Sequence, residues 1–226
     1  MKRILKYFSI FEWFLYITSI LMIVVCFIVF KNNNYFYLIG SLVGVTALIF
    51  LSKGNVLGQI ITVIFSVFNG LVSYSFNYYG EMITYLCMTL PIAVASIISW
   101  MKNPSKENKN EVAINKIKHK EILLLILLSL AVTITFYFIL RALKTTNLII
   151  STISILTSFL VAYLSMRRSS YYAIAYACND IILWILASIK QINYISMVVC
   201  FVAFLINDVY AFINWTRIYK RQKLYF

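Results

Sequence analysis

The chain has 226 residues, of which 62% are apolar and 12% are charged, and its mean hydropathy is +0.88. Soluble domains contain about 45–50% apolar and about 25% charged residues, so this composition excludes a soluble globular protein and a disordered one. Lys and Arg outnumber Asp and Glu by 20 to 7, a net charge of +13. Because the basic residues stand in short gaps between apolar runs, membrane topology accounts for this charge, and we expect no nucleic-acid partner.

Eight apolar runs have the length of about 20 residues that a transmembrane helix needs. They cover residues 10–30, 35–52, 56–78, 82–100, 120–140, 146–164, 171–189 and 193–215. The alternating ten-residue segments of membrane barrels are not present in the sequence. The first run is too long for a signal peptide and has no small-residue cleavage site before Lys31, so we interpret it as a retained signal-anchor helix. The sequence predicts an all-α integral membrane protein with eight transmembrane helices.

The longest polar stretch, residues 101–119, separates two triplets of apolar runs. We expect residues 1–30 to form an N-terminal transmembrane helix and residues 31–100 the first three-helix bundle. Residues 101–145 then form a cytoplasmic loop with a linker helix, and residues 146–226 form the second bundle with a basic tail. The apolar residues among the lysines of the loop predict either a short interfacial helix or a solvated connector; they are Val112, Ile114 and Ile117.

The two triplets share a weak repeat. Leu164-Ser165 follows Leu51-Ser52 by 113 residues, and Trp215 follows Trp100 by 115, each Trp standing two residues before a basic residue. A single connecting helix makes the two triplets parallel, which gives a 3+1+3 core behind the N-terminal helix. Transporters built from parallel repeats have this arrangement, and they bind substrate between the repeats near the bilayer midplane.

The basic residues are distributed unevenly between the two ends of the predicted helices. One end holds four of the twenty: Lys31, Arg141, Lys144 and Lys190. The other end holds the remaining sixteen: Lys2, Arg3, Lys6, Lys53, Lys102, Lys106, Lys109, Lys116, Lys118, Lys120, Arg167, Arg168, Arg217, Lys220, Arg221 and Lys223. Because basic loops stay in the cytoplasm, we expect a multi-pass protein of the plasma membrane with both termini cytoplasmic.

All six glycines fall between residues 40 and 80, and Gly40-x-x-x-Gly44 lies inside the second run. This spacing lets two helices approach closely. Packing within the chain is the default interpretation, and homo-oligomerisation through this face is left open.

No catalytic or metal site is visible in the sequence. The four cysteines lie inside apolar runs, and the single histidine, His119, lies at the end of a lysine-rich loop. We therefore expect no cofactor, no metal and no enzymatic activity.

Polar groups inside two of the predicted helices are the candidate binding residues. Asp180 and Asp208 each follow an asparagine, Asn179 and Asn207. An acid exposed to lipid costs about 2.5–3.5 kcal/mol, so we expect these acids to face a cavity, to be protonated or to meet a cation. Hydrogen bonding between helices is the alternative.

Two further residues complete the candidate set. Trp184 follows Asp180 by one helical turn and offers a surface for stacking a planar cation. Asn69 is a weaker candidate from the first triplet.

Several short motifs stand near the end of each triplet: Tyr79-Gly80-Glu81-Met82, Leu90-Pro91, Trp100, Asn179 with Leu183-Trp184-Ile185, and the segment 205–215, which contains Asn207-Asp208 and ends in Trp215. Together these motifs resemble the PnuC family of nicotinamide riboside transporters. The resemblance implies a SWEET-like pair of three-helix bundles over residues 31–226. It also implies facilitated diffusion of a vitamin precursor, which a cytosolic kinase traps as its phosphate.

The sequence departs from this family at several pocket positions. The Trp-x-x-Trp motif that stacks nicotinamide in the family aligns with Tyr172 and Ala175, and two amide positions align with Tyr85 and Ala93. Relatives of the family transport thiamine, riboflavin or other nucleosides, and these substrates stay open for this chain.

The leading hypothesis is a uniporter for nicotinamide riboside or a similar small vitamin or nucleoside. Asn179 and Asn207 would bind ribose or a base edge, Trp184 and Tyr172 would stack the ring, and Asp180 would balance a pyridinium or thiazolium charge. The alternatives are a proton- or sodium-coupled carrier that uses Asp180 or Asp208, and a substrate-binding subunit of an energised importer.

Overall fold

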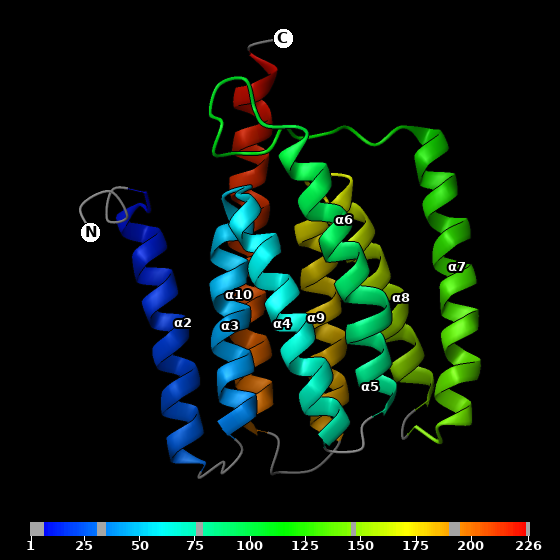
Figure 1. The fold of residues 1–226 in the computed structure, drawn as a ribbon. Coiled ribbons are helices and arrows are strands. Elements are labelled where there is room, and N and C mark those ends of the chain that lie inside the picture. Colours follow the sequence, from blue (N-terminus) through cyan, green and yellow to red (C-terminus); the bar gives the residue numbers. More distant parts are fainter. Residues whose placement is uncertain (1–6, 31–34, 76–78, 146–147, 190–194, 225–226) are drawn as a thin grey trace.

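The computed structural model describes residues 7–30, 35–75, 79–145, 148–189 and 195–224, and these ranges are helical apart from their loops (Figure 1). At positions 184, 186–189 and 195–197 only the main chain is described. The helices are α2 (Ile10–Val29), α3 (Tyr35–Ser52), α4 (Val56–Ser75), α5 (Tyr79–Ile83), the π-helix η1 (Thr84–Thr89), α6 (Leu90–Met101), α7 (His119–Ala142), α8 (Leu148–Met166), α9 (Tyr172–Ile189) and α10 (Ile195–Lys223).

Seven helical stretches in the described residues are long and apolar enough to cross a membrane. One of them, Tyr79–Met101, joins α5, η1 and α6 into a single span, and an eighth apolar stretch, Tyr172–Leu183 in α9, is shorter. The prediction of a helical integral membrane protein is confirmed. The last helix extends to Lys223, beyond the predicted end at residue 215, because a polar helical tail continues past the apolar segment.

Six spans pack in sequence around a ring. α3 packs on α4, α4 on α6, α6 on α8, α8 on α9, α9 on α10, and α10 returns to α3. The first triplet (α3, α4 and the α5–η1–α6 span) and the second triplet (α8, α9 and α10) both run up, down and up in Figure 1. The two triplets thus meet at two places. In each of them the first helix of one triplet packs on the third helix of the other: α3 on α10, and α8 on α6.

Two helices lie outside the ring. α2 packs on α3 and α10, and its Glu12 carboxylate is buried against Lys53 Nζ at 2.9 Å and accepts a hydrogen bond from Tyr210 Oη at 2.7 Å. α7 packs on α8, and its Glu121 forms an ion pair with Arg167 at 2.6 Å. The Glu121 carboxylate also accepts a hydrogen bond from the Arg167 guanidinium, and this raises the pKa of Arg167, which lies in the loop after α8. Polar contacts therefore fix both outer helices to the ring.

The upper end of the molecule in Figure 1 is named the basic end here, since it carries the turn at Lys53, the loop at Arg167 and Arg168, and both described chain ends. At this end the repeat motifs make reciprocal contacts between the triplets. Trp100 Nε1 donates to the Ser165 carbonyl oxygen at 2.8 Å, and Trp215 Nε1 donates to the Leu51 carbonyl oxygen at 2.9 Å.

The residues that precede these tryptophans also donate hydrogen bonds to the main chain of the other triplet. Ser99 Oγ donates to the Met166 carbonyl oxygen, and Asn214 Nδ2 donates to the Ser52 carbonyl oxygen, both at 2.8 Å. The two indole rings are at most 1% exposed and lie 5.5 Å apart. The weak sequence repeat thus corresponds to the contact between the two triplets.

Residues 102–118, named the strap here, cross the basic end (Figure 1). Val112 N donates to the Gly54 carbonyl oxygen at 2.9 Å, and Asn115 N donates to the Arg168 carbonyl oxygen at 3.0 Å. The Val112 side chain is 2% exposed and packs in the cluster that contains both tryptophans. The strap contains no helix, so the predicted interfacial helix is wrong, and the burial of Val112 also contradicts a freely solvated connector.

The π-helix η1 lies where Pro91 interrupts normal helical bonding. Proline has no N–H to donate to the carbonyl of residue 87, and its ring crowds that carbonyl. The backbone N–H of Leu90 donates instead to the Tyr85 carbonyl oxygen, five residues back. The wider turn shifts the side chains of Thr84–Thr89 relative to an α-helix, and π turns of this kind are frequent at functional sites.

Candidate functional site: a cavity inside the ring

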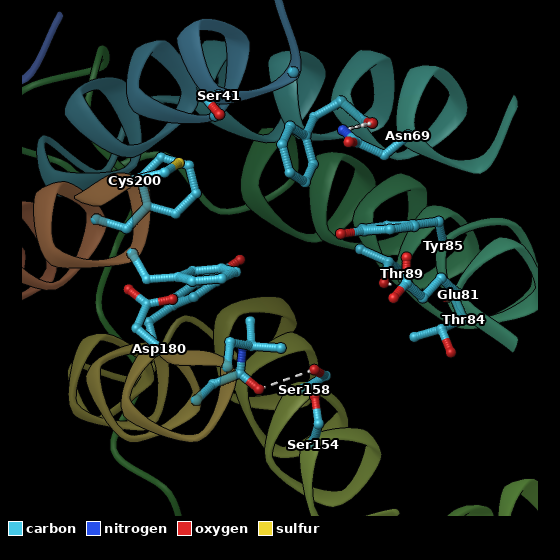
Figure 2. A pocket seen from close by; sticks show the side chains of 18 of the residues that line it. Ser41, Asn69, Glu81, Thr84, Tyr85, Thr89, Ser154, Ser158, Asp180 and Cys200 are labelled. Atoms are coloured by element: carbon cyan, nitrogen blue, oxygen red, sulfur yellow. Dashed lines mark hydrogen bonds between the residues drawn. The ribbon is translucent and has the colours of Figure 1, made fainter. Parts of the chain in front are cut away.

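A cavity of about 330 Å³ lies inside the ring (Figure 2). All six ring spans contribute side chains to its wall, the third through α5 and η1, and the walls contain both aromatic and polar groups. Hydroxyl and amide groups come from both triplets, so a ligand in this space would contact both. The basic end is filled by the cluster around Trp100, Trp215 and Tyr172.

Two acids lie in the wall formed by the second triplet. Asp180 is at the middle of α9 and Asp208 is on α10, and they are 4% and 1% exposed. The two helices that carry them pack on each other. Asp180 Oδ2 and both carboxyl oxygens of Asp208 are buried and have no hydrogen-bond partner within the described ranges. The sequence left open whether these acids face a cavity or bond between helices, and the structure places both of them in the cavity wall.

Asn179 is held in a fixed orientation beside the acids. Its Oδ1 accepts hydrogen bonds from two α8 hydroxyls, Thr157 Oγ1 at 2.8 Å and Ser158 Oγ at 3.0 Å. Figure 2 shows the bond from Ser158. Asn179 Nδ2 makes no hydrogen bond among the residues that the structure describes, and the side chain lines the cavity. The amide therefore presents a donor to the cavity while its acceptor is occupied.

The opposite wall belongs to the first triplet. Figure 2 shows Asn69, Tyr85 and Thr89 across the cavity from Asp180 and Ser158. Asn69 Nδ2 donates to the Phe65 carbonyl oxygen on its own helix at 2.8 Å. Tyr85 lies on the π-helix η1 and lines the cavity.

The structure places two predicted site residues outside the cavity wall. Asn207 Nδ2 donates to Ser19 Oγ on α2 at 2.9 Å and to the Ala203 carbonyl oxygen at 2.8 Å. Tyr172 Oη donates to the Leu51 carbonyl oxygen at 3.1 Å, and its ring contacts Trp215 at 4.5 Å. Both side chains hold helices together at these places. Trp184 lies on α9, but its side chain is outside the described part of the chain.

Several aromatic residues of the cavity wall were not anticipated from the sequence. Tyr176 lies one turn before Asp180 on α9, and Phe204 lies one turn before Asp208 on α10. The spacing of four residues from each acid is the signal that could have identified them, because residues at i and i+4 share a helical face.

The charged groups in the described wall are all acidic. They are Glu81, Asp180 and Asp208, and no Lys, Arg or His is part of this wall. Within the described residues no group of three metal-ligating side chains is present either. The site is suited to an organic molecule with hydroxyl groups, an aromatic ring and no negative charge.

A ring of membrane-spanning helices around an internal cavity, with polar groups among the aromatic and apolar ones of its wall, is the arrangement expected of a membrane transporter. The comparison with known proteins specifies the family: the model described as "Nicotinamide mononucleotide transporter" matches residues 34–217. The chain therefore belongs to the nicotinamide mononucleotide transporter family, and the resemblance to PnuC proteins is confirmed. A transporter, as opposed to an enzyme, is confirmed with it.

Individual relatives agree with this assignment. The nicotinamide riboside transporter PnuC of Neisseria mucosa is 24% identical over 204 residues, which cover 86% of this chain and 76% of that protein. A crystal structure of the vitamin B3 transporter PnuC matches with a TM-score of 0.79 at 21% identity, over 95% of this chain and 94% of that one. The fold is therefore the PnuC fold.

Proposed function

We propose that this protein transports nicotinamide riboside through the central cavity, by facilitated diffusion. The observation that carries this proposal is the composition of the cavity wall, which joins aromatic rings, hydroxyl groups, the free amide donor of Asn179 and the acid pair. A riboside needs hydrogen bonds for its sugar, a stacking surface for its ring and an anion for its pyridinium charge. Each of these is available on one wall of the cavity.

The absence of basic residues from the described wall favours the riboside over the mononucleotide. Phosphate groups in proteins are bound by Arg, Lys or exposed helix N-termini, whereas the described wall holds three acids and no Lys, Arg or His. The acids would repel a phosphate. Nicotinamide riboside has no phosphate and carries one positive charge, so it matches the wall in both respects.

Individual roles follow from the positions of the side chains. Asn179 Nδ2 donates to the sugar or to the carboxamide, Asp180 balances the pyridinium charge, and Asp208 supports Asp180. Tyr176, Tyr85 and Phe204 provide stacking surfaces, and Asn69 approaches the substrate from the first triplet. These assignments are supported by the lining of the cavity and by the hydrogen bonds of Asn179.

The movement that carries substrate is proposed to be a rocking of the two triplets. The eight spans would comprise α2, a SWEET-like 3+1+3 core and its linker helix α7, with both termini and the strap in the cytoplasm of a cell whose plasma membrane holds the protein. The reciprocal contacts between Trp100, Trp215 and the partner triplet support two equivalent halves. A cytosolic kinase would keep the inward gradient by phosphorylating the riboside.

The test is uptake into proteoliposomes that contain the purified protein. Radiolabelled nicotinamide riboside is expected to equilibrate without an imposed ion gradient, and the mononucleotide is expected to remain outside. Excess unlabelled thiamine, riboflavin and uridine, added separately, measure whether another substrate is preferred. Uptake of the mononucleotide at the same rate as the riboside would contradict the assignment.

A further inference from the structure

The two outer helices are attached differently at the two contacts between the triplets. At the first contact, where α3 packs on α10, the outer helix α2 packs on both partners. At the second contact, where α6 packs on α8, the outer helix α7 packs on α8, and its Glu121 pairs with Arg167 on that same side. α7 meets the first triplet at Gly80, where an added Cβ would lie 2.8 Å from Leu140.

The carboxylate of Glu12 on α2 bonds to both triplets at the first contact. It is 3% exposed and accepts hydrogen bonds from Lys53 Nζ at 2.9 and 3.1 Å and from Tyr210 Oη at 2.7 Å. Lys53 lies in the turn between α3 and α4 of the first triplet, and Tyr210 lies on α10 of the second. Because a buried carboxylate that loses its cationic partner is left uncompensated at a high cost, Glu12 opposes separation of the triplets at this place.

Two further hydrogen bonds of α2 reach both triplets. Tyr16 Oη lies 3.0 Å from Thr46 Oγ1 on α3, and Ser19 Oγ accepts from Asn207 Nδ2 on α10 at 2.9 Å. Tyr16 and Ser19 follow Glu12 by four and seven residues, so the three side chains share one face of α2. That face is therefore bonded to α3 and to α10 over about two helical turns.

The second contact contains the irregular part of the ring. The π-helix η1 belongs to the span that packs on α8, and η1 itself contacts α8. Helices bend most readily at prolines and π turns, and Pro91 stands two residues after the end of η1. α3 and α10, whose main chains are described over their full lengths, contain neither a proline nor a π turn. The span that can bend thus lies at the contact that α2 does not bridge.

We propose that the α3–α10 contact stays closed throughout the transport cycle, because Glu12 joins α2 to both triplets there, and that the cavity opens at the α6–α8 contact. The inference rests on the proposed function, since it specifies where the rocking of the triplets takes place. Glu12 is not part of the described cavity wall, so it is a positioning residue that acts through the helices it joins and does not touch the substrate.

The first experiment cross-links each contact separately. One cysteine pair, Ser52→Cys/Asn214→Cys, crosses the α3–α10 contact, and the other, Ser99→Cys/Met166→Cys, crosses the α6–α8 contact. The pairs are matched, because in each of them one side chain donates to the carbonyl oxygen of the other residue at 2.8 Å. A short bismaleimide joins the cysteines, and intact mass gives the cross-linked fraction. The parent chain has its native cysteines replaced: Cys26→Ala, Cys87→Ala, Cys178→Ala and Cys200→Ala.

Uptake of nicotinamide riboside into proteoliposomes is the measurement for both pairs. The cross-link between positions 52 and 214 is expected to leave uptake within about two-fold of the parent, since that contact does not open. The cross-link between positions 99 and 166 is expected to lower uptake about ten-fold or more, because it blocks the movement that admits the substrate. The same variants without the reagent are the controls.

The second experiment removes the bridge in a chain that keeps its native cysteines. Glu12→Gln preserves the size of the side chain but removes the charge that meets Lys53. Turnover is expected to fall about five-fold with KM unchanged, because part of the population then opens at the wrong contact while the cavity wall stays intact. Glu121→Gln removes the ion pair of the other outer helix and is the matched control, with turnover expected to stay unchanged.

A rescue separates positioning from a merely structural role. Turnover is calculated per folded transporter, measured by size-exclusion chromatography, so a loss of folded protein alone would not change it. In the cysteine-replaced parent, the cross-link between positions 52 and 214 is expected to restore the turnover lost through Glu12→Gln, because the reagent then holds the contact that Glu12 held.

Three results would overturn the inference and leave the proposed function intact. They are a loss of uptake with both cross-links, unchanged uptake with the cross-link between positions 99 and 166, and wild-type turnover of Glu12→Gln. If the unmodified protein takes up no nicotinamide riboside, the proposed function is wrong and the inference is wrong with it.

Discussion

The two triplets have the same helix directions but differ in the residues that they carry. Each runs in the same three directions, and each ends in a tryptophan that donates to the main chain of the other triplet. Yet all six glycines are in the first triplet and its turns, whereas the second contains none and holds both buried acids of the cavity wall together with Asn179. The close approaches at glycine thus belong to the first triplet, and the buried acids and the fixed amide of the wall belong to the second.

The two triplets thus share the residues that join them at the basic end, but they differ in the side chains that they place inside the ring. Gly44 on α3 and Thr157 on α8 are 113 residues apart, the same offset as the Leu-Ser motif. At Gly44 an added Cβ would lie 2.7 Å from Phe204 of the other triplet, whereas Thr157 holds Asn179 by a hydrogen bond. Equivalent positions thus serve packing in one half and orientation of a polar group in the other.

The largest effect is expected from Gly58→Ala, which tests the packing role of the first triplet. The new Cβ would lie 2.6 Å from the backbone nitrogen of Leu51, an atom that cannot move without displacing α3. Overpacking of this kind costs about 1–3 kcal/mol or more, and we expect a large loss of thermal stability in detergent. Gly40→Ala is the matched control, because its Cβ would meet only the movable side chain of Asn69 at 3.0 Å. Equal losses for the two variants would contradict the explanation.

The next largest effect is expected on riboside uptake when the two amide side chains of the cavity wall, Asn179 and Asn69, are removed one at a time. Asn179→Ala removes the donor that faces the cavity and the acceptor of the Ser158 hydroxyl, whereas Thr157 keeps the carbonyl oxygens of Ile153 and Ser154 as acceptors. Riboside uptake is therefore expected to fall about ten-fold or more. Asn69→Ala removes an amide whose donor is already used by its own helix, and a decrease of about two- to three-fold is expected. Initial rates of uptake measure both. A larger loss for Asn69→Ala would place the binding chemistry in the first triplet.

A smaller effect tests the equivalence of the two tryptophans. Trp100→Phe and Trp215→Phe each keep an aromatic ring but leave a buried carbonyl of the other triplet without its indole donor. We expect each to lower the free energy of unfolding by about 1 kcal/mol, which corresponds to a few degrees in the melting temperature. Measurement of both by thermal unfolding shows whether the losses agree, and a loss confined to one variant would contradict reciprocity.

The smallest effect is expected from Ser158→Ala. It removes one of the two hydroxyls that fix Asn179, and Thr157 retains the other hydrogen bond. Hydrogen bonds between membrane helices contribute about 0.6 kcal/mol on average, so the KM for riboside is expected to rise about two- to three-fold. Thr152→Ala removes an α8 hydroxyl that bonds its own helix outside the cavity wall, so it serves as the control and is expected to leave KM unchanged.

Much of the fold could be predicted because a membrane helix is determined by apolar length. The predicted run 10–30 became Ile10–Val29, and 171–189 became Tyr172–Ile189. The π turn before Pro91 could not be predicted, since it depends on how one helix relieves a missing donor. The buried strap could not be predicted either, because its hydrogen bonds join segments that are distant in the sequence.

The acids of the site could be found because a charged residue in an apolar run is costly unless something balances it. Asn207 shows the limit of that reasoning. It is adjacent to Asp208, but successive residues on an α-helix point about 100° apart, so Asp208 lines the cavity while Asn207 binds Ser19 on α2. Which of two neighbouring polar residues faces the cavity depends on packing that the sequence does not display.

The way in which the strap is attached to the basic end determines which substitutions this end tolerates. Its bonds to the turn at Gly54 and to Arg168 use backbone donors and backbone acceptors, so they do not depend on side-chain identity. A change of side chain at these two points would therefore leave both bonds in place, whereas a proline at position 112 or 115 would remove a donor outright. At these points the attachment of the strap tolerates substitution and is sensitive to the loss of a single N–H.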